Sequence, residues 1–377
     1  MTFDHLSFKV ANNKFKQLLN NLYFFNLYMI YSFKAKFSSF HHFYSGIAIL
    51  LLLLPGISVN SFAQQAAANA KDKTAVPQIL PGKGAKEFDF FYAGEQKARN
   101  MYIVRNGKIT WSYIDTTGKG EISDAVLMSN GNILFAHQFG VTLIDSNKKI
   151  LWNYDAPAGY ETHTAQPIGK DHVLFIQNGN PAKLFVINVK TGKTEKEFVL
   201  PVKNPTSVHG QFRHARLTKS GTIMVAHMDM GKVREYDING KELLSIDVPG
   251  VWSVEPLDNG NILVAGNKNL VQEITREGKV IWECTQADIP DYKFSSPQIA
   301  LRLPNGNTMV NNWFNQWGNK VDSNNFPVQA IEFTPDKKVV WALREWNAPL
   351  DLGPSTTIQI LGKHRTAPEK VHFGNIR

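Results

Sequence analysis

Short alternating stretches of apolar residues recur along the chain, and each is entered through a tight polar turn. The clearest pair is residues 259–264 (Asn-Gly-Asn-Ile-Leu-Val) and residues 278–282 (Gly-Lys-Val-Ile-Trp). Asn-Gly adopts positive φ at little cost, so it is the strongest short-range signal for a hairpin. Alternation with a period of two places one face of a strand in a core. Each half of the pair therefore predicts a turn that runs into a strand.

Both halves are repeated along the chain. Further copies of the first half start at Asn130, Lys170, Ser220 and Asn305, and further copies of the second half start at Gly107, Lys148, Gly192, Gly240 and Lys337. The glycines at 221, 260 and 306 are 39 and 46 residues apart. A period of roughly 40–50 residues made of short strands is typical of a β-propeller with about four strands per blade. Heptads, long helical stripes and βαβ alternation are absent from the sequence, so we predict an all-β fold.

The ends of the repeat array indicate how the ring closes. There are six copies of the second half and five of the first, and the extra copy lies at the N-terminal end. Residues 100–113 are therefore expected to supply outer strands to a blade whose inner strand is residues 356–361. This gives a six-bladed β-propeller of four-stranded antiparallel blades without an unpaired edge. The alternative is a seven-bladed ring in which residues 88–93 belong to a degenerate extra unit.

The first 63 residues differ from the rest of the chain. Residues 46–59 form an apolar run, which Lys34 and Lys36 precede and Ser61-Phe62-Ala63 follows. This pattern predicts a signal peptide over residues 1–63, cleaved after Ala63, with Met29 as an alternative start. The apolar run is shorter than the about 20 residues that a membrane span needs. We therefore expect no stable membrane span after cleavage, and an uncleaved anchor is the alternative.

The remaining chain reads as one exported domain with short flanks. Residues 64–86 are rich in Ala, Lys and Pro and predict a flexible linker. Residues 87–363 form the predicted propeller, and residues 364–377 a C-terminal tail. The signal predicts a periplasmic or secreted protein.

The net charge and the cysteine content limit the partners and the disulfides that the protein can have. The formal charge is +9, but residues 1–63 hold five lysines and one aspartate, which leaves +5 for the mature chain. Lysines fall mostly in turns and aromatic residues at strand positions, so we expect no nucleic-acid partner. Cys284 is the single cysteine, which excludes an intramolecular disulfide. We expect it to be a small buried residue, with a reactive thiol as the alternative.

Three segments of the last full repeat carry a family resemblance. They are residues 303–310 (Leu-Pro-Asn-Gly-Asn-Thr-Met-Val), 332–336 (Glu-Phe-Thr-Pro-Asp) and 339–341 (Val-Val-Trp). The chain resembles the pyrroloquinoline-quinone (PQQ)-like propeller superfamily over about residues 88–362, and within it the bacterial arylsulfotransferases and their relatives. The matching residues form turns and blade cores, so the resemblance implies a fold more than a function.

The resemblance implies two activities that can be compared with the residues of this chain. Quinoprotein dehydrogenases hold the quinone between a tryptophan and a disulfide of adjacent cysteines, beside a calcium ion. This chain has one cysteine, and the repeat accounts for the tryptophans at 111, 152, 282 and 341. We therefore expect no bound PQQ and no other cofactor.

Arylsulfotransferases imply a nucleophilic channel histidine assisted by histidine, arginine and asparagine. The innermost strands of a propeller line its axial channel, and aligning them on the repeat identifies two rows of residues. The position ten residues before each Ile133-like residue is occupied by Ser123, His163, Arg213, Trp252 and Gln298, and the next by Asp124, Thr164, His214, Ser253 and Ile299. The candidate catalytic residues are His163, His214 and Arg213. An imidazole can attack an electrophile or move a proton, and Arg213 can hold an anion in bidentate fashion.

A wider set of residues is predicted to bind a ligand at the same channel mouth. It comprises Glu161, Gln211, Trp252, Gln298, Trp313, Trp317 and Ser355. Residues 311–318 break the repeat and place two tryptophans in a long loop, which suits stacking on sugar rings; the alternative is packing against the neighbouring blade. The histidines at 209, 214 and 227 do not match a closed zinc spacing, so we expect no metal.

The sequence leaves three functions open. The first is binding of a small molecule, a carbohydrate or an envelope protein partner at the channel mouth. The second is an enzyme of arylsulfotransferase-like, hydrolase or lyase type that uses the channel histidines. The third is a non-catalytic scaffold for a protein complex, which would have a plugged channel and an exposed apolar patch.

Overall fold

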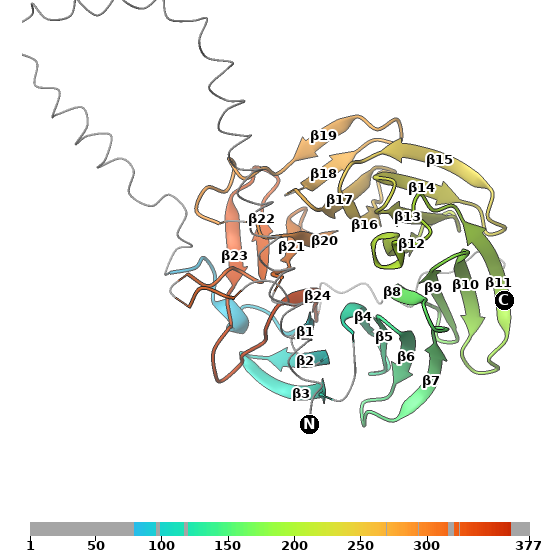
Figure 1. The fold of residues 1–377 in the computed structure, drawn as a ribbon. Helices are drawn as coiled ribbons and strands as arrows, with labels where there is room; N and C mark the ends of the chain where they lie inside the picture. The colour runs from blue at the N-terminus through green and yellow to red at the C-terminus, as the bar shows by residue number, and fades with distance from the viewer. Residues whose placement is uncertain are drawn as a thin grey trace, which may run out of the picture. The chain divides into compact units, whose positions relative to one another are not determined.

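A computed structural model of the protein describes residues 79–362, except 96–98, 117–119, 269, 293, 316–319 and 324. The described residues form six four-stranded antiparallel sheets, arranged as blades around a central axis (Figure 1). The predicted signal peptide, most of the linker and the C-terminal tail lie outside the described residues. In the described part of the chain, no helix is long and apolar enough to cross a membrane.

Blade 1 consists of β24 (Ser355–Ile360), β1 (Phe90–Glu95), β2 (Arg99–Arg105) and β3 (Lys108–Asp115). Blade 2 consists of β4 (Ile122–Leu127), β5 (Ile133–His137), β6 (Gly140–Ile144) and β7 (Ile150–Asp155). Blade 3 consists of β8 (Glu161–Ile168), β9 (His172–Asn178), β10 (Ala182–Asn188) and β11 (Thr194–Leu200).

Blade 4 consists of β12 (Phe212–Leu217), β13 (Ile223–His227), β14 (Lys232–Tyr236) and β15 (Glu242–Asp247). Blade 5 consists of β16 (Val251–Pro256), β17 (Ile262–Gly266), β18 (Leu270–Ile274) and β19 (Val280–Glu283). Blade 6 consists of β20 (Pro297–Arg302), β21 (Thr308–Asn312), β22 (Ala330–Phe333) and β23 (Val339–Leu343). Two short 3₁₀ helices, η1 (Gly84–Lys86) and η2 (Val208–Gly210), precede β1 and β12.

The Asn-Gly turns form where the sequence places them. Between β4 and β5, the Asn130 side chain accepts a hydrogen bond from the main-chain nitrogen of Asn132 at 3.1 Å, and Gly131 takes a φ of 85°. The turns that start at Asn259 and Asn305 have the same side-chain hydrogen bond. The side chain thus closes the turn locally, as Asx turns do.

The hydrophobic core lies between neighbouring blades. One cluster joins blades 5 and 6 through buried Leu263, Val271 and Phe333, and it includes Cys284, which is 1% exposed. This confirms the prediction of a buried cysteine. The fourth strands β7, β15 and β19 are much more exposed, since they form the rim of the ring, whereas β23 is largely buried.

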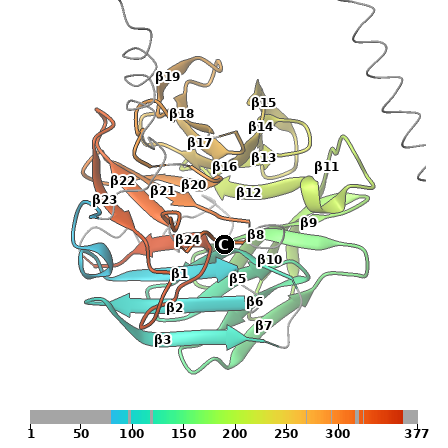
Figure 2. The same cartoon turned by 60° about the vertical axis from the view of Figure 1, so that its left-hand side comes forward.

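Strands from both chain ends close the ring, as the repeat count predicts (Figures 1 and 2). Inner strand β24 pairs with β1, with Tyr92 opposite Ile358. The assignment of residues 88–93 to a seventh blade is wrong, because residues 90–93 form the start of β1, the second strand of blade 1. The side chain of Gln359 also bonds both main-chain groups of Leu127 in blade 2, at 3.0 Å each.

The described end of the predicted linker lies against blade 6. Ala85 is buried, and the indole nitrogen of Trp341 donates to the carbonyl of Gly84 at 2.9 Å. The main-chain nitrogen of Ala342 donates to the carbonyl of Pro81 at 3.3 Å. Residues 81–85 therefore pack against β23, although they precede the domain start that the sequence indicates.

Candidate functional site

A β-bulge interrupts every inner strand near the end at which that strand begins. Each inner strand has one more residue than its partner at this point. The bulges contain Ser123, His163 with Thr164, Arg213 with His214, Trp252, Gln298, and Thr356. A bulge re-aims a side chain and ends regular pairing, which is why bulges are common beside functional sites. The row of residues that the sequence alignment selects is therefore the row of bulges.

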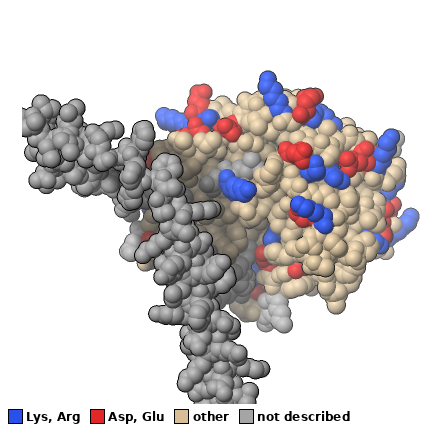
Figure 3. Space-filling model, turned by 45° about the horizontal axis from the view of Figure 1, so that its top comes forward, with Lys and Arg blue, Asp and Glu red and all other residues tan. Residues whose placement is uncertain are grey.

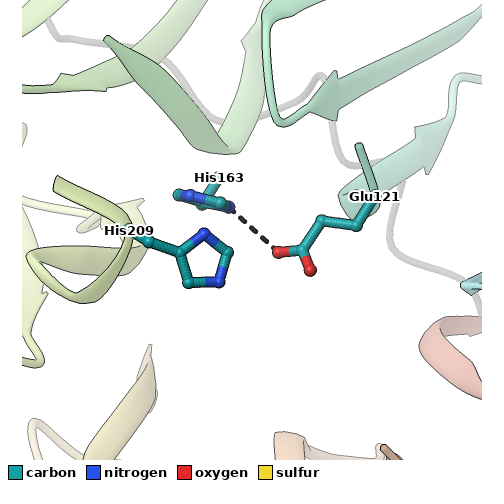
Figure 4. Close-up of side chains that lie close together, drawn as sticks. All are labelled: Glu121, His163 and His209. Atoms are coloured by element: carbon teal, nitrogen blue, oxygen red, sulfur yellow. Dashed lines mark ion pairs between the residues drawn. The ribbon is translucent and has the colours of Figure 1, made fainter. Parts of the chain in front are cut away.

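Three consecutive blades bring six polar side chains together at this end of the channel. They are Glu121 and Ser123 from blade 2, Glu161 and His163 from blade 3, and His209 and Arg213 from blade 4, and we call them the Arg213 cluster. Figure 4 shows Glu121, His163 and His209 pointing toward one another from separate strands and loops. Of these six residues, Glu161, His163 and Arg213 are sequence-predicted site residues.

Arg213 lies at the centre of the cluster. Its guanidinium donates to Nδ1 of His163 at 2.8 Å and to Nε2 of His209 at 2.7 Å, and it forms an ion pair with Oε1 of Glu121. Arginine has donors only, so both of these ring nitrogens must accept and must carry lone pairs. Nδ1 of His163 and Nε2 of His209 are therefore the acceptor nitrogens in this arrangement.

Glu161 accepts a hydrogen bond from the other ring nitrogen of both His163 and His209. Its Oε2 accepts from Nε2 of His163 at 2.9 Å and from Nδ1 of His209 at 2.8 Å. Its Oε1 accepts from the side-chain amide of Gln138 at 2.7 Å. One carboxylate thus sets the tautomer of two histidines.

The two carboxylates of the cluster are ionised at neutral pH. Burial raises the pKa of Glu121, but the positive charge of Arg213 outweighs this effect and holds the pKa well below its ordinary value. For Glu161, burial likewise raises the pKa, and the hydrogen bonds from His163 and His209 lower it further than burial raises it. With one arginine against two carboxylates, the cluster carries a net charge of −1.

Ser123, His163 and Glu161 form a serine–histidine–acid arrangement. The Ser123 hydroxyl lies 3.0 Å from Nδ1 of His163, whose Nε2 donates to Glu161. The hydroxyl also donates to Glu121 at 2.8 Å, and Arg213 occupies the same ring nitrogen. Ser123 is 1% exposed, so the hydroxyl is not available to a substrate while Arg213 keeps this position.

His214 lies outside the Arg213 cluster. It is 1% exposed, and neither ring nitrogen has a well-formed hydrogen bond among the described residues. Burial lowers the pKa of His214 to about 4; Asp124 and the main chain of Ser123 oppose this shift, and Arg216 adds to it. A buried neutral imidazole of this kind cannot contact a ligand in the channel, and its catalytic role stays a prediction.

The other half of the mouth is aromatic. The rings of Trp252 and Trp313 pack edge to face, with centroids 6.1 Å apart. Gln298, in the next bulge, is 5% exposed, and its Oε1 has no hydrogen-bond partner among the described residues; the same holds for Nε1 of Trp313. These groups offer an unused acceptor and an unused donor beside an aromatic surface.

Of the three remaining predicted site residues, two are buried and hydrogen-bonded within the fold, and one lies outside the described residues. The side chain of Gln211 accepts from the main chain of Gly179 at 2.7 Å and is fully buried. Ser355 is also fully buried and bonds the side-chain amide of Asn311. Trp317 lies outside the described residues.

A cavity of about 1180 Å³ occupies the channel toward the end at which the inner strands finish. Its basic side chains already have acidic partners: Arg216 pairs with Asp124 and Arg302 pairs with Glu273. Glu255 is half-buried in its wall, and burial raises the pKa of Glu255 to about 7. No residue of the Arg213 cluster lines this cavity, so the cavity and the cluster lie at different ends of the channel.

Sequence reasoning missed Glu121 and did not connect His209 with His163. A signal for Glu121 was present, because residues 121–123 (Glu-Ile-Ser) align with residues 161–163 (Glu-Thr-His) on the repeat. His209 belongs to η2, which precedes β12 and lies outside the repeat, so the repeat gives no register there.

Comparisons with known proteins support the fold. No protein-family model matches the chain, and no curated protein matches it in sequence. A solved protein of unknown function from Bacteroides caccae superposes with a TM-score of 0.63 at 26% identity, over 72% of this chain and 98% of that one. A streptogramin B lyase has a TM-score of 0.46 at 12% identity, covering 72% of this chain and 86% of that one.

A virginiamycin B lyase from Staphylococcus aureus also has a TM-score of 0.46, at 14% identity, and the match covers 70% of this chain and 97% of that one. Likenesses as weak as these two carry no argument about activity. The chain is a six-bladed β-propeller protein. Its membership of the PQQ-like superfamily and its likeness to arylsulfotransferases stay predictions.

Proposed function

We propose that this protein binds a carbohydrate at the end of the channel where the inner strands begin. The observation that carries the proposal is the pair of unused polar groups, Oε1 of Gln298 and Nε1 of Trp313, beside the ring of Trp252. Sugars present apolar ring faces to tryptophan and hydroxyls to amide and indole groups. Both atoms are buried in this arrangement, and a buried polar atom without a partner costs free energy. A ligand hydroxyl would recover that free energy once the side chain of Trp313 turned outward.

The Arg213 cluster favours a neutral polyhydroxy ligand over a small anion. The donors of Arg213 already bond Glu121, His163 and His209, and the cluster has a net negative charge. An added sulfate or phosphate would meet ionised carboxylates. Sugar hydroxyls can donate to those carboxylates beside the ring of His209, whose side chain is 49% exposed.

A thermal-shift screen of the full chain against neutral oligosaccharides, sulfated phenols and inorganic sulfate, run with a chelator, tests the proposal. A ligand at 100 times its Kd stabilises the folded state by about 2.7 kcal/mol. We expect a neutral oligosaccharide to raise the melting temperature, and Trp252→Ala or Gln298→Ala to abolish that rise. Trp111→Ala is the matched control, because this tryptophan lies on the outer strand β3. A response to sulfate alone would contradict the carbohydrate proposal.

The serine–histidine–acid arrangement favours a second candidate, a hydrolase or transferase that uses Ser123, His163 and Glu161. Arg213 would have to move to free Nδ1 of His163, which could then take the proton of the Ser123 hydroxyl. Turnover of aryl esters or aryl sulfates that Ser123→Ala abolishes would support this function. Equal turnover by the wild-type protein and Ser123→Ala would exclude it.

The predicted signal peptide indicates the compartment in which the protein would bind its ligand. If it directs export, the channel mouth meets ligands in the periplasm or outside the cell, where oligosaccharides are present. Detection of the mature chain in the periplasmic or culture fraction would test this part of the proposal.

A further inference from the structure

Three ligand atoms of the Arg213 cluster converge on one point. They are the atoms that Arg213 contacts, namely Oε1 of Glu121, Nδ1 of His163 and Nε2 of His209. Each of these three residues offers a ligand atom within 4.8 Å of those of the other two. Nδ1 of His163 is 3.2 Å from Oε1 of Glu121. Ligands of a tetrahedral zinc ion at about 2.0–2.1 Å are about 3.4 Å apart, so a small adjustment of the side chains would let all three reach one ion.

We propose that Glu121, His163 and His209 form a binding site for a divalent transition-metal ion, with Zn²⁺ as the best-matched ion. Two imidazoles and one carboxylate are a common ligand set for zinc, and three protein ligands leave a position open for water or another ligand. This inference goes beyond the proposed carbohydrate binding, because the metal alone can be titrated without any sugar.

The second layer of contacts is already arranged for a metal. Glu161 accepts hydrogen bonds from the outward-facing nitrogens of both histidines, at 2.9 and 2.8 Å. Histidine ligands of metals characteristically donate their other ring nitrogen to a carboxylate, which fixes the tautomer and the ring orientation. The lone pairs of His163 and His209 therefore point inward before any ion arrives, and Gln138 in turn holds Glu161.

Arg213 occupies the place that the ion would take. Its guanidinium contacts the same three residues, and through the same three atoms. Its long side chain can swing aside and leave Glu121 and Glu161 with a charge of −2, which a divalent cation neutralises. Arg213 is thus a built-in cation that competes with the metal for the site.

Cobalt and zinc titrations of the full chain test the site. We expect Co²⁺ to give visible absorption bands typical of histidine and carboxylate coordination, and Zn²⁺ to displace it. His209→Ala removes a half-exposed ligand with little disturbance of the core, so it should lose the bands and stay folded. Glu161→Gln should weaken Zn²⁺ binding by about 10–100-fold, because it removes the carboxylate that orients both rings.

Two further variants show whether Zn²⁺ binds at the proposed site. Arg213→Met removes the competing cation at similar length, so it should bind Zn²⁺ at least about tenfold more tightly than the wild-type protein. His172→Ala is the control, since this histidine contacts Glu195 on blade 3, away from the cluster. Binding that persists in His209→Ala and His163→Ala would overturn the proposal. Binding by Arg213→Met but not by the wild-type protein would also overturn it, because Arg213 would then be a permanent occupant.

Discussion

At the scale of single residues, environment rather than residue type decides which groups are available for chemistry. His163 and His214 both lie in inner-strand bulges of neighbouring blades, and both are almost fully buried. His163 has partners at both ring nitrogens, whereas His214 has none with good geometry among the described residues. The ring of His163 is therefore fixed in one orientation, and burial keeps His214 neutral.

Glu255 should make stability depend on pH. Burial, supported by Asp124 and Asp258 and opposed by Arg216, raises the pKa of Glu255 from 4.5 to about 7. Because the folded-state pKa is the higher one, the stabilisation is fully present below pH 4.5 and is lost as pH rises through 7. Because Glu255 is half-buried, solvent screening reduces this effect, and we expect the wild-type free energy of unfolding to fall by about 2 kcal/mol between pH 4.5 and 7 on account of Glu255.

Glu255→Gln should remove this part of the pH dependence. The measurement is urea unfolding between pH 4.5 and 8 for the wild-type protein, Glu255→Gln and the exposed control Glu283→Gln. Parallel pH profiles for all three proteins would show that the ionisation of Glu255 is not linked to folding.

At the scale of elements, the inner strands are joined by side chains that bond the main chain of the next blade. Asp124 accepts from the main-chain nitrogen of Ala165, and Gln166 accepts from that of Leu217. Gln359 does the same at the seam of the ring, where it bonds both main-chain groups of Leu127. Inner strands in a propeller do not pair with one another as strands do within a sheet, so these contacts take the place of a ladder.

Gln359→Ala should destabilise the ring at its seam. It removes both hydrogen bonds between the Gln359 side chain and the main chain of Leu127, and each such bond contributes about 0.5–1.5 kcal/mol to stability. Gln272→Ala on β18 is the control, because its amide bonds the exposed carboxylate of Glu283. A loss of stability in Gln359→Ala no larger than that in Gln272→Ala would contradict this role.

At the scale of the whole molecule, ring closure should make unfolding cooperative. Blade 1 combines the last inner strand with the first three strands, so opening this blade exposes edges on both sides. The surface that Figure 3 shows has acidic and basic side chains interspersed, without a broad region of one sign. Stability therefore comes from the cores between blades and from closure rather than from a charged surface.

Cys284 provides a test of cooperativity. Burial, supported by Asp288, raises the pKa of the Cys284 thiol to about 12, and the side chain packs in the core between blades 5 and 6. Because the thiolate is the reactive form, we expect negligible labelling by a thiol reagent in the native state. Labelling and tryptophan fluorescence should share one denaturant midpoint. Labelling at a clearly lower denaturant concentration would show that blades 5 and 6 open independently.

The sequence by itself determined the repeat, the blade number and the closure of the ring. These properties rest on local chemistry, because Asn130-Gly131 and its copies form their turns from neighbouring atoms and alternating strands pair with the next strand along the chain. The same register also identified the bulge row, including His163, Arg213 and Gln298.

Only the tertiary structure decided which of those residues meet. Glu121 and Arg213 are 92 residues apart, and a ring brings them together although no sequence spacing links them. The expectation of no metal rested on spacing along the chain, and spacing does not register ligands that come from separate blades. Whether a buried side chain finds a partner, as His163 does and His214 does not, depends on the neighbouring blades, and so the candidate site required the fold.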